Sequence, residues 1–298
     1  MGAILSPDIP GIPLFRKGKV RNVYDLGSEL LFVVSDRISA FDVVMPNGIP
    51  DKGKVLNMIS SFWFDFTKDI AENHMITVDV DRILKLYPEL APYKDVIKGR
   101  SMLVKKAEPI PIECIVRGYL SGSGWKDYKK NGSICGIKLP KGLTESEKLE
   151  KPIFTPSTKA EEGHDINVSE EELKGMFPEE LLEDLKQKSI ALYNKASEFA
   201  REKGIIIADT KFEFGKIGDK VIFMDEALTP DSSRFWPQDD YEKGRAQKSF
   251  DKQFVRDYLE GLDWDKTPPG PELPEAIVNK TRDKYVEAYE ILTGKKLT

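Results

Sequence analysis

A predicted β-hairpin in the second half of the sequence constrains the fold and the site more than any other feature. An apolar run over residues 205–208 leads into alternating polar and aromatic residues, and a second apolar run over residues 221–224 follows a Gly-Asp turn. Side chains on a strand alternate between its two faces. We therefore expect Asp209, Lys211 and Glu213 to share one face of this hairpin, with the phenylalanines between them buried on the other.

Hydrophobic patterns elsewhere predict further hairpins separated by helices. Short apolar runs predict strands over residues 20–25, 30–34, 102–104 and 112–116, and helical spacing predicts helices over 55–70, 181–204, 250–258 and 277–292. Since hairpins alternate with helices, an α+β fold is favoured over a doubly wound parallel sheet. We expect a β-rich N-terminal lobe over residues 1–110 and an α+β C-terminal lobe over residues 111–298, which ends in a helix.

Charge and composition narrow the class of protein. The 298 residues carry a formal charge of −5, and residues 161–184 alone hold ten acids and one base, so the rest of the chain is net positive. This balance excludes a basic nucleic-acid-binding coat and a polybasic membrane tether. The chain has two cysteines, no apolar run of membrane-spanning length and no signal-peptide pattern at its N-terminus. We expect a cytoplasmic protein with reduced thiols.

The predicted hairpin also concentrates carboxylates. Asp225 ends the second apolar run, so a turn at Gly218 would bring it back toward the strand that carries Glu213. Three carboxylates and a lysine on one surface suit Mg²⁺ that carries nucleotide phosphates. The alternative is an exposed strand with ordinary cross-strand ion pairs. Spacing alone leaves both interpretations open.

Three other segments combine cations with small residues. Residues 16–21 place four cations around Gly18, Arg117 precedes a stretch rich in Gly and Ser, and residues 229–234 form a hydroxyl-rich turn that ends in Arg234. Such segments can bind anions through backbone N–H groups and guanidinium forks. A solvated basic turn, or an Arg117 that pairs with Glu113, remains the alternative.

Residues 48–55 partly match the Walker A motif of nucleotide phosphate-binding loops, but they lack two features that this motif needs. Val55 stands where the Mg²⁺-binding hydroxyl belongs, and Pro50 removes an N–H group. We interpret this segment as a turn before the helix predicted from residue 55.

Together, six segments resemble the SAICAR synthetase (phosphoribosylaminoimidazole-succinocarboxamide synthase) family over nearly the whole chain. They cover residues 18–24, 35–42, 111–123, 155–165, 207–215 and 225–234. The third and fifth are highly specific in combination. The length and the proline-rich segment before the last helix are similar to the longer, yeast-like form, and Ser121 stands where Thr or Ala is usual.

The resemblance implies a two-lobed, ATP-grasp-like fold with ATP between the lobes. It implies a purine-biosynthesis ligase that joins L-aspartate to the carboxylate of carboxyaminoimidazole ribonucleotide (CAIR), with ATP and Mg²⁺ and through an acyl phosphate. The products would be SAICAR, ADP and phosphate. It also implies small-molecule substrates, no nucleic-acid or membrane partner, and a monomer. The alternatives are a small-molecule kinase with the same ATP cleft and a nucleotide-binding regulator without turnover.

The resemblance also implies a role for individual residues. Glu213 and Asp225 would hold Mg²⁺, and Lys211, Asp209, Lys159 and Asp165 would form the catalytic group. The nucleotide would be bound by Gly18, Lys19, Val20, Arg21, Lys105 and Glu113. The ribonucleotide would be bound by Arg117, Ser123, Asp231, Ser232, Ser233 and Arg234.

Overall fold

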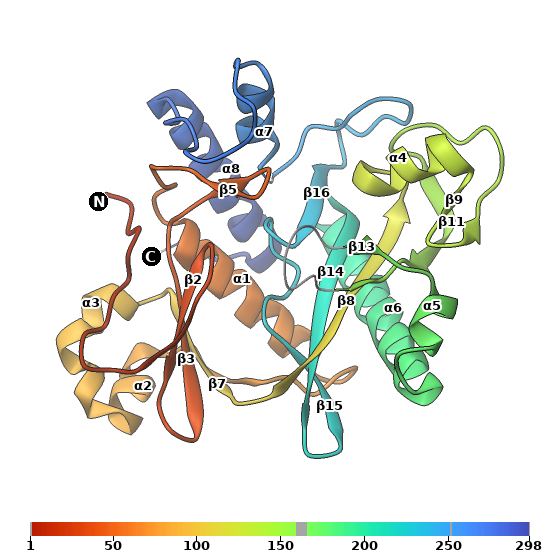
Figure 1. The fold of residues 1–298 in the computed structure, drawn as a ribbon. Coiled ribbons are helices and arrows are strands. Elements are labelled where there is room, and N and C mark those ends of the chain that lie inside the picture. Colours follow the sequence, from red (N-terminus) through yellow and green to blue (C-terminus); the bar gives the residue numbers. More distant parts are fainter. Residues whose placement is uncertain (1, 159–165, 251, 298) are drawn as a thin grey trace.

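The chain folds into two antiparallel sheets that flank a central helix (Figure 1), which confirms the predicted α+β class. The computed structural model describes residues 2–158, 166–250 and 252–297. Within these residues, no helix has both the length and the apolar character needed to cross a membrane.

The first sheet contains the predicted N-terminal hairpin. Its strands, in spatial order, are β1 (Leu14–Lys17), β2 (Arg21–Asp25), β3 (Glu29–Val34), β7 (Ser101–Lys105) and β6 (Met75–Thr77). Three short helices follow β6 and pack on one face of this sheet: α2 (Val80–Leu86), η1 (Pro88–Tyr93) and α3 (Lys94–Ile97). A short β4–β5 hairpin (Ser39–Ala40 and Val43–Val44) lies beside it.

The second sheet is built around two long strands, β8 (Glu108–Tyr119) and β14 (Ile205–Ile217). Around them pair β11 (Lys148–Phe154), β12 (Ser157–Thr158), β13 (Ile166–Asn167), β15 (Lys220–Met224) and β16 (Ser233–Pro237). The predicted 205–224 hairpin is confirmed as β14–β15. Residue 110, the expected lobe boundary, falls inside β8, which belongs to the second sheet and follows β7 of the first after a short connection.

A bulge in β14 exchanges the two faces of the strand partway along its length. Ile207 pairs with Phe235 of β16, and Asp209 pairs with Arg234, the adjacent residue of that strand. Between these two pairs β14 therefore has one residue more than β16. Ile207 therefore packs in the main core before the bulge, and the even-numbered Phe212 and Phe214 pack there after it. The bulge leaves Asp209, Lys211 and Glu213 on the opposite face.

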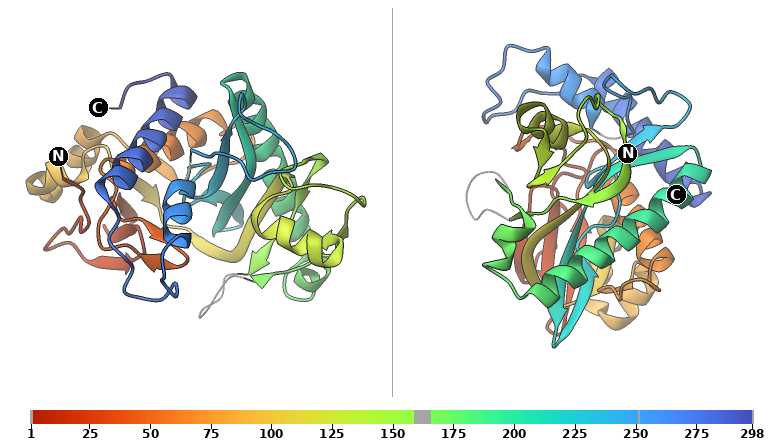
Figure 2. Two further views of the ribbon diagram at one scale, coloured as in Figure 1. Left: turned by 90° about the horizontal axis from the view of Figure 1, so that it is seen from above. Right: turned by 90° about the vertical axis from the view of Figure 1, so that its right-hand side faces the viewer.

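Helices connect and cover the two sheets. α1 (Lys52–Phe66) lies between them, α6 (Glu179–Glu202) covers the second sheet (Figure 2), and α8 (Glu275–Thr293) packs along α1. Most of the buried apolar residues of α1, α6 and α8, and those on one face of β14, belong to one continuous core. Smaller elements are α4 (Gly122–Asn131), β9 (Ser133–Ile134), β10 (Ile137–Lys138), α5 (Glu170–Lys174) and α7 (Gln253–Glu260). Ser169 and Glu172 form a capping box at the start of α5.

The two sheets also meet through the segment that precedes β6. The backbone N–H of His74 donates to the carbonyl oxygen of Phe223 on β15 (3.1 Å), and its carbonyl accepts from Lys105 on β7 (2.8 Å). The His74 ring is buried edge-on between Phe32 and Phe64, and its Nε2 has no hydrogen-bond partner among the described residues. Burial lowers the pKa of His74 from 6.5 to about 3.

We expect His74 to make the protein less stable as the pH falls. Its pKa is lower in the folded state, so the unfolded chain binds the extra proton first and folding stability is lost below pH 6.5. Substitution His74→Phe should flatten the dependence of unfolding free energy on pH between pH 6.5 and about 4, by up to ~1.4 kcal/mol per pH unit. Denaturant titrations of both proteins measure this, and parallel curves would contradict it.

Candidate functional site

The glycine turn before β2 forms one wall of the site and is held in shape by its own backbone and by Arg37. The N–H of Gly18 donates to the carbonyl oxygen of Arg21 (2.8 Å), and a Cβ on Gly18 would lie 3.1 Å from that oxygen. The Arg37 guanidinium donates to the carbonyl oxygens of Lys19 (2.8 Å) and Gly18 (3.0 Å). The turn is therefore preformed, and its carbonyl groups are engaged behind it.

A cleft of about 330 Å³ separates this turn from the carboxylates of the second sheet. Glu213 of β14 and Asp225, which follows β15, line the cleft opposite Lys19 and Arg21. Apart from Arg16, Gly18 and Lys106, the remaining lining is apolar and comes from Phe15, Val20, Val23, Leu30, Phe32, Ala107, Pro109 and Met224. An apolar slot that ends between cations and carboxylates suits a flat ring attached to phosphates.

Arg21 bridges the two walls of the cleft. Its guanidinium forms an ion pair with Asp225 and lies 4.4 Å above the Phe32 ring. Burial opposes its charge, but the carboxylates of Asp225, Glu226 and Glu213 outweigh this effect and raise the pKa of Arg21. Arg21 is therefore a fixed positive charge at the point where an anionic ligand would enter.

Lys211 and Glu213 lie on the same face of β14, as the sequence predicts. Lys211 forms an ion pair with Glu113 of β8, and its Nζ lies 3.7 Å from Glu213 Oε1. Glu113 also accepts a hydrogen bond from the Ser157 hydroxyl (3.0 Å). Burial lowers the pKa of Lys211, but the neighbouring carboxylates more than compensate and raise it. Lys211 therefore stays an ammonium ion, which can neutralise an anion but cannot act as a base.

A second, smaller pocket of about 190 Å³ adjoins the cleft. The two share Lys19, Val20, Glu213 and Asp225 as lining residues. The pocket is completed by Ser39, Lys211, Glu226, Asp231, Ser232 and Lys252. Two ligands that occupied the cleft and this pocket would meet beside Glu213 and Asp225.

Further along β14, two arginines converge on Asp209. Arg117 Nη1 lies 3.0 Å and Arg234 Nη1 lies 2.6 Å from the same carboxylate oxygen. Arg117 is buried and also donates to the Ser123 hydroxyl (3.0 Å), whereas the Arg234 side chain is 30% exposed. Burial lowers the pKa of Arg117, against the pull of Asp209.

This arginine cluster has the character of an anion site. α4 begins at Gly122, directly beside the Arg234 guanidinium, since a Cβ on Gly122 would lie 2.2 Å from Arg234 Nη2. Two guanidinium groups share one carboxylate, so the cluster keeps a net positive charge next to a helix N-terminus. A phosphate group, which carries the opposite charge and can accept bidentate hydrogen bonds from guanidinium groups, suits such a cluster.

Several predicted site residues lie outside these pockets. Lys105 forms an ion pair with Glu72 (3.2 Å), and its neighbour Lys106 lines the cleft instead. Glu113 contacts the site through Lys211, and the Ser233 hydroxyl bonds to that of Thr210 (2.7 Å). Lys159 and Asp165 lie outside the described residues.

Besides Lys106, sequence reasoning missed three cations that act on the site: Arg37, Lys52 and Lys252. Lys52 and Lys252 contact Asp231 at 2.8 Å and 3.2 Å. One signal was available, because Lys52 is the first residue of α1, where the helix dipole disfavours a cation. A lysine at that position needs a carboxylate partner, but the sequence does not reveal which one.

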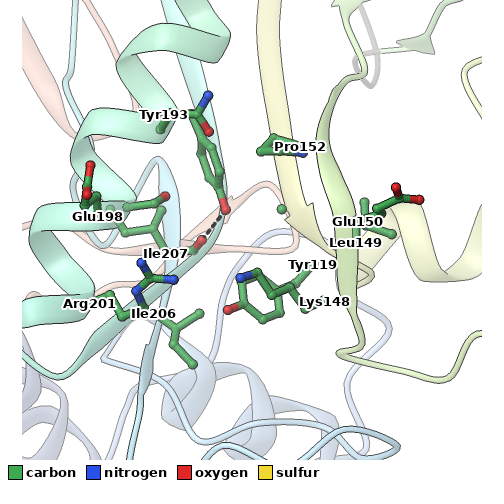
Figure 3. A pocket seen from close by; sticks show the side chains of 13 residues that line it. Tyr119, Lys148, Leu149, Glu150, Pro152, Tyr193, Glu198, Arg201, Ile206 and Ile207 are labelled. Atoms are coloured by element: carbon green, nitrogen blue, oxygen red, sulfur yellow. Dashed lines mark hydrogen bonds between the residues drawn. The ribbon is translucent and has the colours of Figure 1, made fainter.

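Another pocket, of about 310 Å³, lies between α6 and the start of β14 (Figure 3). There the hydroxyl of Tyr193 donates to the carbonyl oxygen of Ile207 (2.7 Å), and it fits only because residue 118 is glycine. Among the residues that the structure describes, no predicted site residue lines this pocket, and it shares no lining residue with the cleft.

Comparisons with known proteins agree with the sequence patterns. The family model described as SAICAR synthetase matches residues 14–271. A phosphoribosylaminoimidazole-succinocarboxamide synthase of Thermodesulfovibrio yellowstonii is 58% identical, over 98% of this chain and 99% of that protein.

Solved structures agree as well. The SAICAR synthase of Saccharomyces cerevisiae, solved with SAICAR, is 44% identical with a TM-score of 0.88 and covers 99% of both chains. A SAICAR synthetase solved with ADP shares the fold at 22% identity and a TM-score of 0.70, over 95% of this chain and 99% of that one.

We predict that Gly122→Ala weakens anion binding at the arginine cluster, because the new Cβ displaces the Arg234 guanidinium. Inorganic phosphate should raise the unfolding temperature of the wild type, and its apparent affinity should fall about tenfold in Gly122→Ala. Gly132→Ala is a matched control, since Gly132 ends the same helix at a similar positive φ with nothing within 4 Å. An equal response to phosphate in the two variants would contradict the assignment.

Proposed function

Because this chain belongs to the SAICAR synthetase family, and is an enzyme of that type in purine biosynthesis, we propose that it uses ATP to join L-aspartate to the carboxylate of CAIR. The reaction would pass through an acyl phosphate and release ADP and phosphate. The observation that carries the proposal is the cleft in which the Gly18 turn faces Glu213 and Asp225.

ATP would occupy this cleft. The apolar lining accepts the base, and Lys19, Arg21 and the backbone of the Gly18 turn face the phosphates. The ADP complex of the related synthetase supports a nucleotide as the ligand of this family's fold.

Glu213 and Asp225 fit a magnesium ion that arrives with ATP. Both are hard oxygen donors on one cleft wall, and among the described residues no group of three or more His, Cys, Asp or Glu side chains could hold a metal by itself. Two carboxylates leave coordination positions for phosphate oxygens, which is the usual arrangement for Mg²⁺. The ion would supply charge neutralisation at the transferred phosphate.

The ribonucleotide would bind between the arginine cluster and the second pocket. Arg234 is the more exposed cation and would contact the 5′-phosphate, while buried Arg117 would position Ser123 and Asp209. The turn at Asp231, Ser232 and Ser233 would orient the ribose or the imidazole. The carboxylate to be activated would then lie near Lys211, at the junction of pocket and cleft.

The chemistry would proceed in two displacements. A carboxylate oxygen attacks the γ-phosphorus of ATP, and the bond to ADP breaks with its electron pair retained by ADP. The aspartate amine then attacks the acyl carbon, phosphate leaves, and the nitrogen loses a proton. Lys211 and Arg21 stay cationic throughout, so their part is to hold and neutralise the reacting anions rather than to accept that proton.

The dependence of ADP release on aspartate tests the proposal. We expect purified protein to release ADP only when ATP, CAIR and L-aspartate are all present, with SAICAR formed in equal amount. ADP formed equally well without aspartate, with a stable phosphorylated product, would indicate a kinase. Tight ATP binding with no turnover would indicate a regulator.

We predict that Glu213→Gln and Asp225→Asn each lower kcat by about 10²-fold or more, because both carboxylates serve the charge stabilisation of the transition state. Raising the Mg²⁺ concentration should restore part of the activity if the variants bind the ion more weakly. Steady-state kinetics over a magnesium titration measure both effects. Near-normal activity in either variant would overturn the metal assignment.

A further inference from the structure

The C-terminal helix α8 reaches the site although it lies beyond the part of the chain that the family model matches. That match ends at residue 271, and α8 spans Glu275–Thr293. The helix packs along α1 (Figure 1). Its Arg282 forms two hydrogen bonds to the carboxylate of Asp51, the residue before α1, at 2.6 Å and 3.0 Å. This ion pair places the middle of α8 beside the first turn of α1.

One turn further along, α8 contacts a carboxylate of the second pocket. The Tyr285 hydroxyl donates to Asp231 Oδ1 (2.6 Å). The other carboxylate oxygen, Oδ2, accepts a hydrogen bond from Lys52 Nζ (2.8 Å) and forms an ion pair with Lys252 Nζ (3.2 Å). The Asp231 side chain is only 7% exposed. Its two oxygens therefore have donors from α8, from α1 and from Lys252, which directly precedes α7, and together these donors fix the plane of the carboxylate.

The two lysines keep the Asp231 carboxylate ionised. The Lys52 side chain is fully buried, and burial lowers its pKa against the pull of Asp231. Burial also opposes the charge on Asp231, but Lys252 and Lys52 outweigh it and lower its pKa. A neutral hydroxyl on the other oxygen completes the coordination without adding a third positive charge.

The held carboxylate belongs to the wall of the substrate pocket. Asp231, Ser232 and Lys252 all line the second pocket. The carbonyl oxygen of Ser232 accepts from the backbone N–H of Lys211 (3.0 Å), so this turn is also tied to β14. A rotation of the Asp231 carboxylate would move Lys252 and the pocket wall together.

We propose that Tyr285 is a positioning residue, through which α8 fixes the Asp231 carboxylate and the Lys252 ammonium for binding of the ribonucleotide. This inference rests on the proposed function, because that function assigns the second pocket to the ribonucleotide. It adds the C-terminal helix to the elements that build the site. The ATP cleft is lined by no residue of α8 or of the Asp231 turn, so we expect loss of this contact to change ATP binding little.

The variant Tyr285→Phe tests the proposal, because it removes one hydroxyl and keeps the buried ring. We expect KM for CAIR to rise about tenfold, while KM for ATP stays within about twofold of the wild type. Tyr289→Phe is the matched control, since Tyr289 is buried on the same helix one turn further along, in the main core. It should leave both KM values unchanged at a similar unfolding temperature.

A double-mutant cycle with Asp231→Asn separates positioning from general loosening. If Tyr285 acts through Asp231, then Tyr285→Phe should add little to the CAIR KM of Asp231→Asn. Additive effects, a CAIR KM unchanged in Tyr285→Phe, or an equal rise in the KM for ATP would each overturn the proposal. If Asp231→Asn does not fold, the split between the two KM values of folded Tyr285→Phe still decides the question.

Failure of this inference can be told apart from failure of the proposed function. A wild type that releases ADP without needing both CAIR and aspartate would overturn both. A wild type with the expected three-substrate dependence, together with an unaffected Tyr285→Phe, would overturn only the role of α8.

Discussion

The site depends on one irregularity in backbone pairing, the extra residue that β14 inserts before Asp209. In a regular strand, Asp209, Lys211 and Glu213 would share the face that buries Ile205 and Ile207. Their charged side chains would then point into the core. The bulge exchanges the faces once, so the apolar start of the strand and the phenylalanines that follow pack on the same side. Every carboxylate that β14 offers to the site is placed by that exchange.

Burying so many charges beside one sheet is costly unless each is paired. Arg21 pairs with Asp225, Lys211 with Glu113, and the two arginines share Asp209. Such pairs add little net stability, because the loss of hydration offsets the attraction. What they provide is fixed orientation, so anionic ligands meet cations that are already in place and need little reorganisation.

The sequence predicts well what local pattern controls and less well what depends on distant contacts. The hairpins, the helix of residues 181–204 and the shared face of Lys211 and Glu213 follow from periodicity, and the structure contains them. By contrast, α4 begins inside a segment of glycine and serine that has no helical signal. The pairing of Lys52 with Asp231 joins residues 179 positions apart, which no local pattern encodes.

The net charge of −5 does not describe the charge at the site, because most of the excess acids lie away from it. The acids of residues 170–184 lie on α5 and the first turns of α6, where several pair with lysines of the same helices, as Glu170 does with Lys186 and Asp184 with Lys188. None of these acids lines the cleft or the second pocket. The field that an incoming phosphate or carboxylate experiences is set at short range by cations such as Lys19, Arg21 and Arg234, because solvent and salt screen charges more than about 10 Å away. An acidic chain can therefore present a site that attracts anions.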